Sequence, residues 1–228
     1  MIRVIAIAAL MWVGATDAFA QAKPRPRTSP PAPQSRGIDI GGYAMAGVMN
    51  FTAADSFDVI FGRPSGPIFG GGGRIGLPLR TGFGGVFVDV GAWRFHDEGE
   101  RVFVFNGEAF DLNIPVEITI MPIELTAGWQ FRLRRMPRFR PYVAVGYSSY
   151  GYKETSPFNT PDEDVDDRFN GYHAFGGAEL KMTRWLGVAG EVNWTTIPDA
   201  IGIGGVSAEF DETDLGGTSI RFKITIGR

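Results

Sequence analysis

Apolar residues recur at every second position through eight stretches of the sequence, and this period of two constrains the fold more than any other feature. The stretch 123–133, IELTAGWQFRL, shows it clearly, because Ile123, Leu125 and Trp129 alternate with polar or small residues such as Glu124. Side chains of a β-strand point alternately to its two faces. Each stretch therefore predicts a strand with one apolar and one polar face.

The spacing of the eight predicted strands indicates how they are connected. The strands are predicted at 38–50, 67–79, 83–95, 117–133, 141–153, 167–182, 185–197 and 219–226. Short links at 80–82, 134–140 and 183–184 alternate with long links at 51–66, 96–116, 154–166 and 198–214. This alternation is the plan of outer-membrane barrels. We therefore expect an all-β fold, an eight-stranded antiparallel up-and-down transmembrane β-barrel with short periplasmic turns and long outer loops.

The N-terminal region predicts export. Residues 1–20 contain Arg3, an apolar run and the small-x-small sequence Ala18-Phe19-Ala20, which are the parts of a signal peptide. Residues 21–37 hold five prolines and four basic residues, which favour an extended periplasmic linker. Residues 38–228 then form the barrel domain, and the expected location is the outer membrane of a Gram-negative bacterium.

Composition is consistent with this plan and excludes several classes of function. Mean hydropathy is near zero, which suits a barrel because its strands alternate apolar and polar residues. A formal net charge of −3 gives no general basic field for nucleic acid. The sequence has no cysteine, so disulfides and thiol chemistry are excluded. After residue 20, the sequence offers no uninterrupted apolar run of the roughly 20 residues needed for a transmembrane helix.

The polar faces of the strands point into the barrel if the apolar faces meet lipid. An eight-stranded barrel is only wide enough for side chains to fill it. Charges in so narrow a space are expected to pair, since an unpaired buried charge is strongly unfavourable. The expected structural lumen network comprises Arg74, Asp89, Glu124, Arg132, Glu179, Lys181, Glu191, Arg221 and Lys223. A gated pore or proton path through these charges is the alternative interpretation.

Aromatic residues fall near both ends of the predicted strands, which suggests two girdles at the membrane interfaces. The inner girdle is expected from Phe83, Trp129, Phe131, Tyr142 and Trp185. The outer girdle is expected from Trp93, Phe95, Tyr150 and Trp194.

The long links contain local signals of their own. Asn106-Gly107 predicts a tight hairpin turn, so the third and fourth strands are expected to continue beyond the membrane or to form a small separate hairpin. Residues 53–62 favour one helical turn. The acidic runs 161–167 and 209–214 lack the spacing of an EF-hand, so we interpret them as solvated loop tips rather than cation sites.

Three features of the sequence could carry chemistry, but none of them supports an enzyme. Gly71, Gly73 and Gly76 match the dinucleotide-binding spacing, but Pro78 prevents the helix that such a site requires. His96 is expected on the outer rim, and His173 in the lumen, near Ser148 or Ser149 only if the fifth and sixth strands align favourably. We therefore predict no catalytic, cofactor-binding or metal-ligating residues, and a lipid-acyl hydrolase or transferase stays open as the enzymatic alternative.

Several segments resemble a known family. SFDVIFGRPSGPIFGGGGRI, ERVFVFNGEAFDLNIP, GYHAFGGAEL and FDETDLGG are similar to small porin-like proteins with an outer-membrane β-barrel domain of the OmpA/OmpX type. The resemblance covers about residues 38–228. It implies anchoring, envelope stabilisation or surface contacts, and it carries over no catalytic residue. The last strand keeps the alternation that barrels present to the assembly machinery, but Gly227-Arg228 replaces the usual terminal aromatic residue.

The expected function is that of an integral outer-membrane barrel with a charge-plugged lumen and a structural or surface-interaction role. Two alternatives stay open, a narrow pore for small solutes or ions and an exported lipocalin-like barrel around an apolar ligand. The lipocalin alternative requires that the charged side chains, which alternate with the apolar ones along each strand, face solvent. Expected partners are outer-membrane lipid, the barrel-assembly machinery and a surface partner through the long loops, with no nucleic acid and a monomeric state.

Overall fold

The computed structural model describes residues 37–79, 83–105, 108–158, 165–202 and 205–227. The predicted export signal and all of the predicted linker except Gly37 lie outside the described residues. The Asn106-Gly107 turn and most of the acidic run 161–167 also lie outside them.

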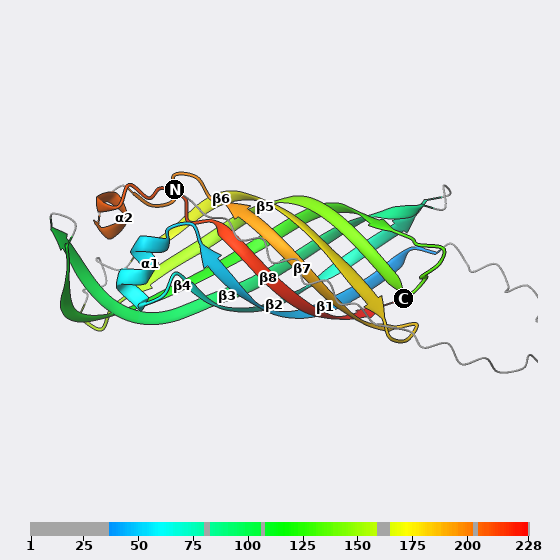
Figure 1. The fold of residues 1–228 in the computed structure, drawn as a ribbon, viewed down its shortest axis with the longest axis horizontal. Coiled ribbons are helices and arrows are strands. Elements are labelled where there is room, and N and C mark those ends of the chain that lie inside the picture. The colour runs from blue at the N-terminus through cyan, green and yellow to red at the C-terminus, as the bar shows by residue number, and fades with distance from the viewer. Residues whose placement is uncertain (1–36, 80–82, 106–107, 159–164, 203–204, 228) are drawn as a thin grey trace, which may run out of the picture. The chain divides into compact units, whose positions relative to one another are not determined.

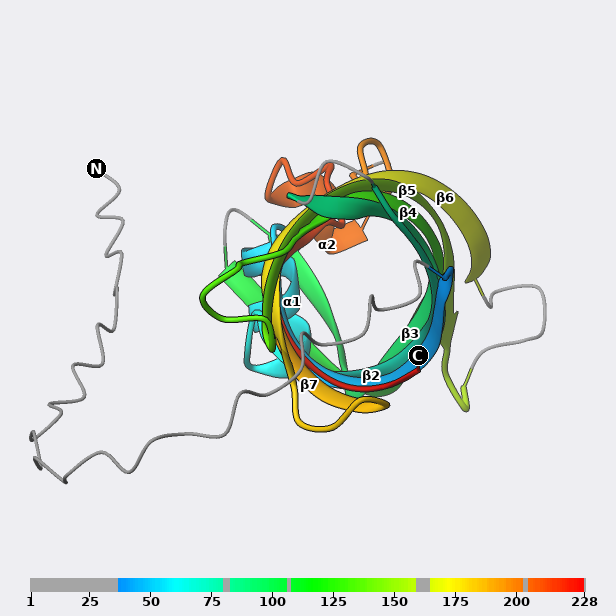
Figure 2. The same ribbon diagram turned by 90° about the vertical axis from the view of Figure 1, so that its right-hand side faces the viewer.

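Eight strands close into one antiparallel barrel within the described ranges, which confirms the predicted fold class. Each strand pairs with the next along the chain, and the last pairs with the first to complete the ring, as the end-on view shows (Figure 2). The strands are β1 (Asp39–Phe51), β2 (Ser65–Pro78), β3 (Gly84–Phe105), β4 (Glu108–Phe131), β5 (Phe139–Thr155), β6 (Val165–Lys181), β7 (Leu186–Thr196) and β8 (Gly217–Gly227).

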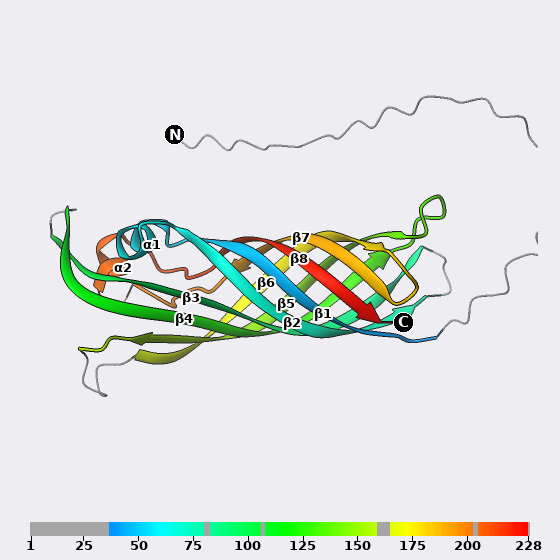
Figure 3. The same ribbon diagram turned by 90° about the horizontal axis from the view of Figure 1, so that it is seen from below.

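The two ends of the barrel differ in what they carry. Two helices, α1 (Ala54–Phe61) and α2 (Gly205–Glu209), lie at the end where the long loops connect the strands, opposite the short turns (Figures 1 and 3). Pairing of β3 with β4 continues to Phe105 and Glu108, so the prediction that these strands extend is confirmed. No helix among the described residues is long and apolar enough to cross a membrane.

The alternation of the sequence sorts side chains onto the outer and inner faces of the barrel wall. On β4, Ile123 and Leu125 are 61% and 55% exposed, whereas Glu124 and Thr126 beside them are buried. A soluble barrel would place the apolar set inside. A wall that is apolar outside and charged inside matches a lipid surround, because exposing so large an apolar coat to water is unfavourable.

The glycines of the dinucleotide-like motif belong to β2, where Gly71 and Gly73 share the outward parity of Phe69 and Ile75. The strand runs on to Pro78 without a helix following it. A Cβ atom at Gly72 would approach the Tyr43 hydroxyl to 2.6 Å, and one at Gly91 on β3 would approach it to 2.5 Å. These two glycines, on the inward face of the wall, leave room for the Tyr43 side chain in the narrow lumen.

Candidate functional site

An ion pair crosses the middle of the lumen. Arg221 donates two parallel hydrogen bonds of 3.0 Å from its guanidinium to the two carboxylate oxygens of Glu124. The indole of Trp93 donates a third hydrogen bond to Glu124, at 2.7 Å. Glu124 lies on β4 and Arg221 on β8, four strands apart in a ring of eight. The pair therefore joins opposite sides of the barrel.

A second carboxylate lies beside this pair. Lys223 Nζ is 2.9 Å from Glu191 Oε2, and the Tyr142 hydroxyl donates a 3.0 Å hydrogen bond to the same oxygen. The other oxygen, Oε1, is 4.0 Å from the Arg221 guanidinium. Glu191 therefore contacts two cationic side chains and one hydroxyl group. Through these contacts it connects Arg221 and Lys223 of β8 with its own strand, β7, and with Tyr142 of β5.

Two further charged groups line the wall. Asp89 accepts hydrogen bonds from Arg74 Nε at 3.1 Å and from the Tyr43 hydroxyl at 2.7 Å. The Arg74 guanidinium also lies 4.1 Å above the Phe87 ring, a cation–π contact. Nearer the short turns, Glu179 accepts hydrogen bonds from Gln130, at 3.2 Å, and Thr225, at 2.5 Å, and lies 3.2 Å from Lys181.

The structure brings eight of the nine sequence-predicted lumen residues into four contacts. These are Glu124 with Arg221, Glu191 with Lys223, Asp89 with Arg74, and Glu179 with Lys181. The partner of Arg74 is Asp89, directly opposite it in the β2–β3 register. Arg132 differs from the prediction. It follows the last residue of β4 and is exposed to solvent, because the strand ends before its side chain reaches the lumen.

A layer of buried apolar side chains fills the lumen between the charged groups and the long loops. We call this layer the apolar cap. Phe51 stacks on Phe57 of α1, with ring centroids 4.0 Å apart, and Phe95 packs edge-on against Phe51 at 4.9 Å. The cap comprises Met45, Met49, Phe51, Ala53, Phe57, Ile68, Trp93, Phe95, Val116, Ile118, Ile120, Tyr150, Ile197, Ala200 and Leu215.

Two acidic residues of the 209–214 run hold the cap in place. Glu212 accepts hydrogen bonds of 3.0 Å from the backbone N–H groups of Asp55 and Ser56, at the N-terminus of α1. Asp214 accepts 2.7 Å hydrogen bonds from the backbone N–H groups of Ile197 and Gly216. The interpretation of this run as solvated loop tips is therefore wrong for these two carboxylates.

The predicted aromatic girdles are only partly present. Phe83, Phe131, Trp185 and Trp194 are exposed on the outer surface, as expected. Tyr142, Trp93, Phe95 and Tyr150 are buried inside the barrel, so their assignment to the girdles is wrong. They occupy the inward parity of β5 and β3, where they line the charged layer or form the cap.

His173 has two hydroxyl partners inside the lumen. Its Nδ1 lies 2.7 Å from Ser148 Oγ and its Nε2 lies 2.8 Å from Thr126 Oγ1. Strands β5 and β6 pair so that Gly146 is opposite His173, which brings Ser148 within reach. The alignment of the fifth and sixth strands on which the predicted Ser148 contact depends is therefore present. All three side chains are buried, and both ring nitrogens contact hydroxyl groups.

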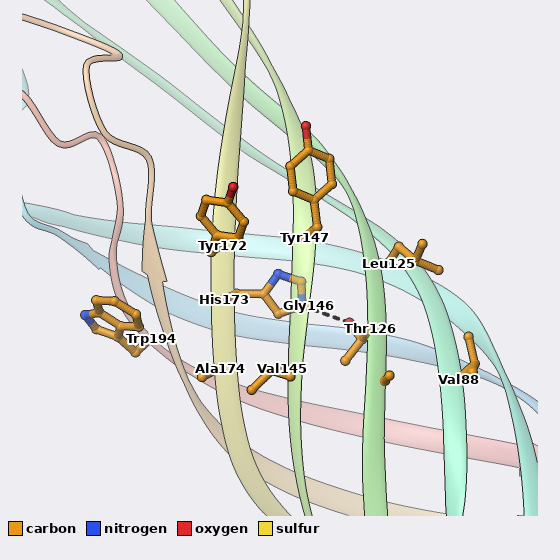
Figure 4. A pocket seen from close by; sticks show the side chains of 11 residues that line it. Val88, Leu125, Thr126, Val145, Gly146, Tyr147, Tyr172, His173, Ala174 and Trp194 are labelled. Atoms are coloured by element: carbon orange, nitrogen blue, oxygen red, sulfur yellow. Dashed lines mark hydrogen bonds between the residues drawn. The ribbon is translucent and has the colours of Figure 1, made fainter.

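The outer surface near His173 is an apolar groove of about 690 Å³. Tyr147 and Tyr172 pack edge-to-face on its rim, with ring centroids 5.7 Å apart, and Trp194 lies on the neighbouring strand (Figure 4). The His173 ring points away toward Thr126 (Figure 4). The groove is therefore part of the apolar outer coat, and both nitrogens of the His173 ring that contributes to its lining contact the hydroxyl groups of Thr126 and Ser148.

His96 lies on the outer face of β3, above the apolar coat. Its Nε2 is 3.3 Å from Glu117 Oε1, and its Nδ1 is 3.0 Å from Thr119 Oγ1. One ligand atom from each of His96, Glu98 and Glu117 falls within 4.8 Å of the others, a spacing that a divalent metal ion can accept. All three side chains are exposed, and the ion pair with Glu117 accounts for the position of the imidazole.

Comparison with solved structures supports the fold. The chain is similar to a major outer membrane protein from Thermus thermophilus, with 12% identity and a TM-score of 0.52 over 84% of this chain and 100% of that one. It also matches Ail, the attachment invasion locus protein of Yersinia pestis, with 13% identity and a TM-score of 0.47 over 83% and 94% of the chains. The N-terminal β-barrel domain of Pseudomonas aeruginosa OprF gives 13% identity and 0.42 over 82% and 99%.

The likeness to the Thermus thermophilus protein identifies the architecture, so the sequence resemblance to small outer-membrane barrels is confirmed at the level of the fold. No family model matches the sequence. No curated protein matches the sequence significantly.

Proposed function

We propose that this protein is an integral outer-membrane barrel whose lumen is closed by its own side chains, with a structural or surface-contact role rather than transport. The observation that carries the proposal is the Glu124–Arg221 ion pair, which spans the lumen beneath the apolar cap. Two chemically different layers therefore obstruct the same axis.

The physical chemistry of the two layers favours closure. A solute that passes the first layer must displace ion pairs whose members are almost fully buried, and parting such a pair leaves uncompensated charge. The second layer is lined mainly by apolar side chains that cannot hydrate an ion, so the passage of an ion through it is opposed by desolvation. Eight strands also leave little cross-section beyond that of the side chains.

The surface-contact part of the proposal concerns the long-loop end. This end presents the β3–β4 extension and the loops around α1 and α2, while the other end has only short turns. With the short turns in the periplasm, as in known outer-membrane barrels, the long loops face the outside. Loops on a rigid barrel are where specificity for a partner is expected.

Recording from planar bilayers tests closure. We expect no stable conductance steps after insertion of the refolded protein, with a heat-modifiable electrophoretic band as proof that the sample is folded. Reproducible steps of constant size from folded protein would contradict the closed lumen and favour the narrow pore.

The arrangement around His173 does not favour an acyl hydrolase. A Ser–His pair resembles the start of a nucleophile–base arrangement, which also needs an orienting third group and access for a substrate carbonyl. Ser148 is fully buried, and the second ring nitrogen contacts Thr126 instead of a carboxylate. We expect Ser148→Ala to change stability and to leave any lipid-hydrolysing activity of the preparation unchanged, which a fatty-acid release assay measures.

The lipocalin-like alternative is also disfavoured. It requires the charged parity to be exposed, whereas Glu124, Glu191 and Arg221 are buried and the apolar parity is exposed. The mature protein is therefore expected in the membrane fraction. Recovery with soluble periplasmic proteins would contradict this assignment.

A further inference from the structure

The short-turn end of the barrel carries arginines that the lumen does not use. The turn between β4 and β5, residues 132–138, reads RLRRMPR, and its four arginines are all exposed. The turn between β6 and β7 adds exposed Arg184. We call these five residues, Arg132, Arg134, Arg135, Arg138 and Arg184, the basic collar.

Backbone hydrogen bonds fix the two turns beside each other. The N–H of Met136 donates to the Leu133 carbonyl at 3.2 Å, and the N–H of Lys181 at the end of β6 donates to the Arg138 carbonyl at 2.9 Å. In the second turn, the Thr183 hydroxyl accepts a 3.0 Å hydrogen bond from the N–H of Leu186. The arginines therefore project from two turns whose backbones are held by hydrogen bonds at the edge of the barrel.

None of the described carboxylates neutralises the basic collar. Among the described residues, no carboxylate oxygen lies within ion-pair distance of any of its five guanidinium groups, and the exposed acid at this end is Asp39, at the start of β1. At the long-loop end, by contrast, two arginines have carboxylate partners. Arg63 lies 2.8 Å from Asp97, and Arg101 lies 3.4 Å from Glu154.

Large apolar side chains surround the basic collar at the edge of the lipid-facing coat. They are Phe83, Phe131, Met136, Met182 and Trp185, each 40% or more exposed. Aromatic rings at such an edge mark the depth of the lipid headgroups. A guanidinium group at that depth can extend into the headgroup layer and hold a phosphate through two parallel hydrogen bonds.

We propose that the basic collar binds the phosphate groups of anionic phospholipids in the leaflet that surrounds the short turns. The inference rests on the proposed bilayer-embedded barrel. Two further observations favour a lipid over a soluble anion. The unpaired positive charge follows the edge of the apolar coat, and its arginines are interspersed with apolar residues that suit acyl chains.

Quenching of Trp185 by brominated lipids tests the proposal. The full chain is refolded into symmetric vesicles of phosphatidylcholine with increasing brominated phosphatidylglycerol or, in parallel, brominated phosphatidylcholine. Trp185 emission is obtained as the difference between the parent and Trp185→Phe. We expect lipid binding at Trp185 to favour phosphatidylglycerol by about fivefold or more at low salt, a factor that one surface arginine can supply. Screening should reduce the preference as ionic strength rises.

A pair of matched variants separates the basic collar from general charge. The collar variant carries Arg134→Gln, Arg135→Gln, Arg138→Gln and Arg184→Gln, and it should lose the preference at Trp185. The control carries Arg63→Gln, Arg94→Gln, Lys153→Gln and Arg168→Gln at the long-loop end, and it should keep the preference. Trp194, at the other end of β7, reports on a distant site and should not respond to the collar variant. If the collar variant fails to fold, Arg135→Gln alone and the salt series in the parent replace it.

The outcomes are distinct. Equal quenching of Trp185 by the two lipids in a folded, heat-modifiable parent would contradict lipid binding by the basic collar and leave the barrel assignment intact. A preference retained by the collar variant, or lost equally in the control, would also overturn it. Binding to purified peptidoglycan without lipid preference would assign the arginines to the cell-wall polymer instead. Failure of the parent to insert at all would contradict the barrel assignment itself.

Discussion

At the scale of single residues, Glu124 shows how the barrel tolerates charge in its interior. Both of its carboxylate oxygens accept hydrogen bonds from Arg221, and one also accepts from Trp93. A buried carboxylate is stable only when its oxygens are satisfied and its charge is matched. The geometry meets both conditions with groups from three strands.

Replacing Glu124 by alanine should therefore lower the free energy of unfolding by about 3–5 kcal/mol, because Arg221 is left charged and buried. Urea titration of the refolded barrel in vesicles measures the loss. The matched control is the double replacement Glu124→Leu with Arg221→Met, which removes both charges together and should lose less than the two single changes added. A Glu124→Ala barrel with an unchanged unfolding midpoint would show that the pair does not stabilise the lumen.

Gly146 is the second residue whose replacement is informative. A Cβ atom there would overlap the His173 ring and lie 2.5 Å from the Leu125 carbonyl oxygen. Gly146→Ala should lower the free energy of unfolding by about 1–3 kcal/mol, as overpacking does. Gly176→Ala on the neighbouring strand is the control, since its Cβ meets its nearest atom at 3.9 Å. Equal unfolding midpoints for the two variants would contradict close packing around His173.

At the scale of elements, the sequence pattern predicted the strands well because strand formation follows a local period. The register of β5 against β6 is not local, so the contact between Ser148 and His173 was stated only as a condition. Parity was sufficient to place Trp93 and Tyr150 inside, since they alternate with outward valines and tyrosines. An aromatic residue near the end of a strand belongs to a girdle only if its side chain also points outward, so position along the strand is not sufficient to assign it.

The apolar cap was not predicted, for a physical reason. Its helix α1 receives its N-terminal hydrogen bonds from Glu212, which is more than 150 positions away in the chain. No local spacing identifies such a partner. The sequence did predict helical structure in 53–62, although α1 is a helix of eight residues instead of one turn.

Removing the Glu212 carboxylate should loosen α1. Glu212→Ala leaves the N–H groups of Asp55 and Ser56 without their acceptor, and loss of such a cap weakens a helix by about 1 kcal/mol. Hydrogen–deuterium exchange should become faster in the peptide containing residues 54–61, while exchange in the barrel strands stays the same. Glu209→Ala, an exposed acidic residue at the end of α2, is the control. Unchanged exchange in the α1 peptide would show that packing of Phe57 alone holds the helix.

At the scale of the whole molecule, polarity is arranged in three zones. The outer wall is apolar, the middle of the lumen holds paired charges, and the long-loop end of the lumen is apolar again. The two ends also differ in charge, because among the described residues the short-turn arginines have no carboxylate within ion-pair distance, while Arg63 and Arg101 at the long-loop end each have one. This asymmetry agrees with a barrel that has one orientation, in which each end meets a chemically different layer.

The orientation can be measured directly, because the chain has no cysteine and each introduced thiol is the only one present. Asp111→Cys on the β3–β4 extension and Arg135→Cys in a short turn replace exposed residues at opposite ends. In intact cells of a Gram-negative host, a membrane-impermeant maleimide should label the Asp111→Cys protein and leave the Arg135→Cys protein unlabelled. Both should react after the outer membrane is opened, which confirms that each thiol is accessible. The reverse pattern would invert the assigned topology, and labelling of both in intact cells would contradict an outer-membrane barrel with its short turns in the periplasm.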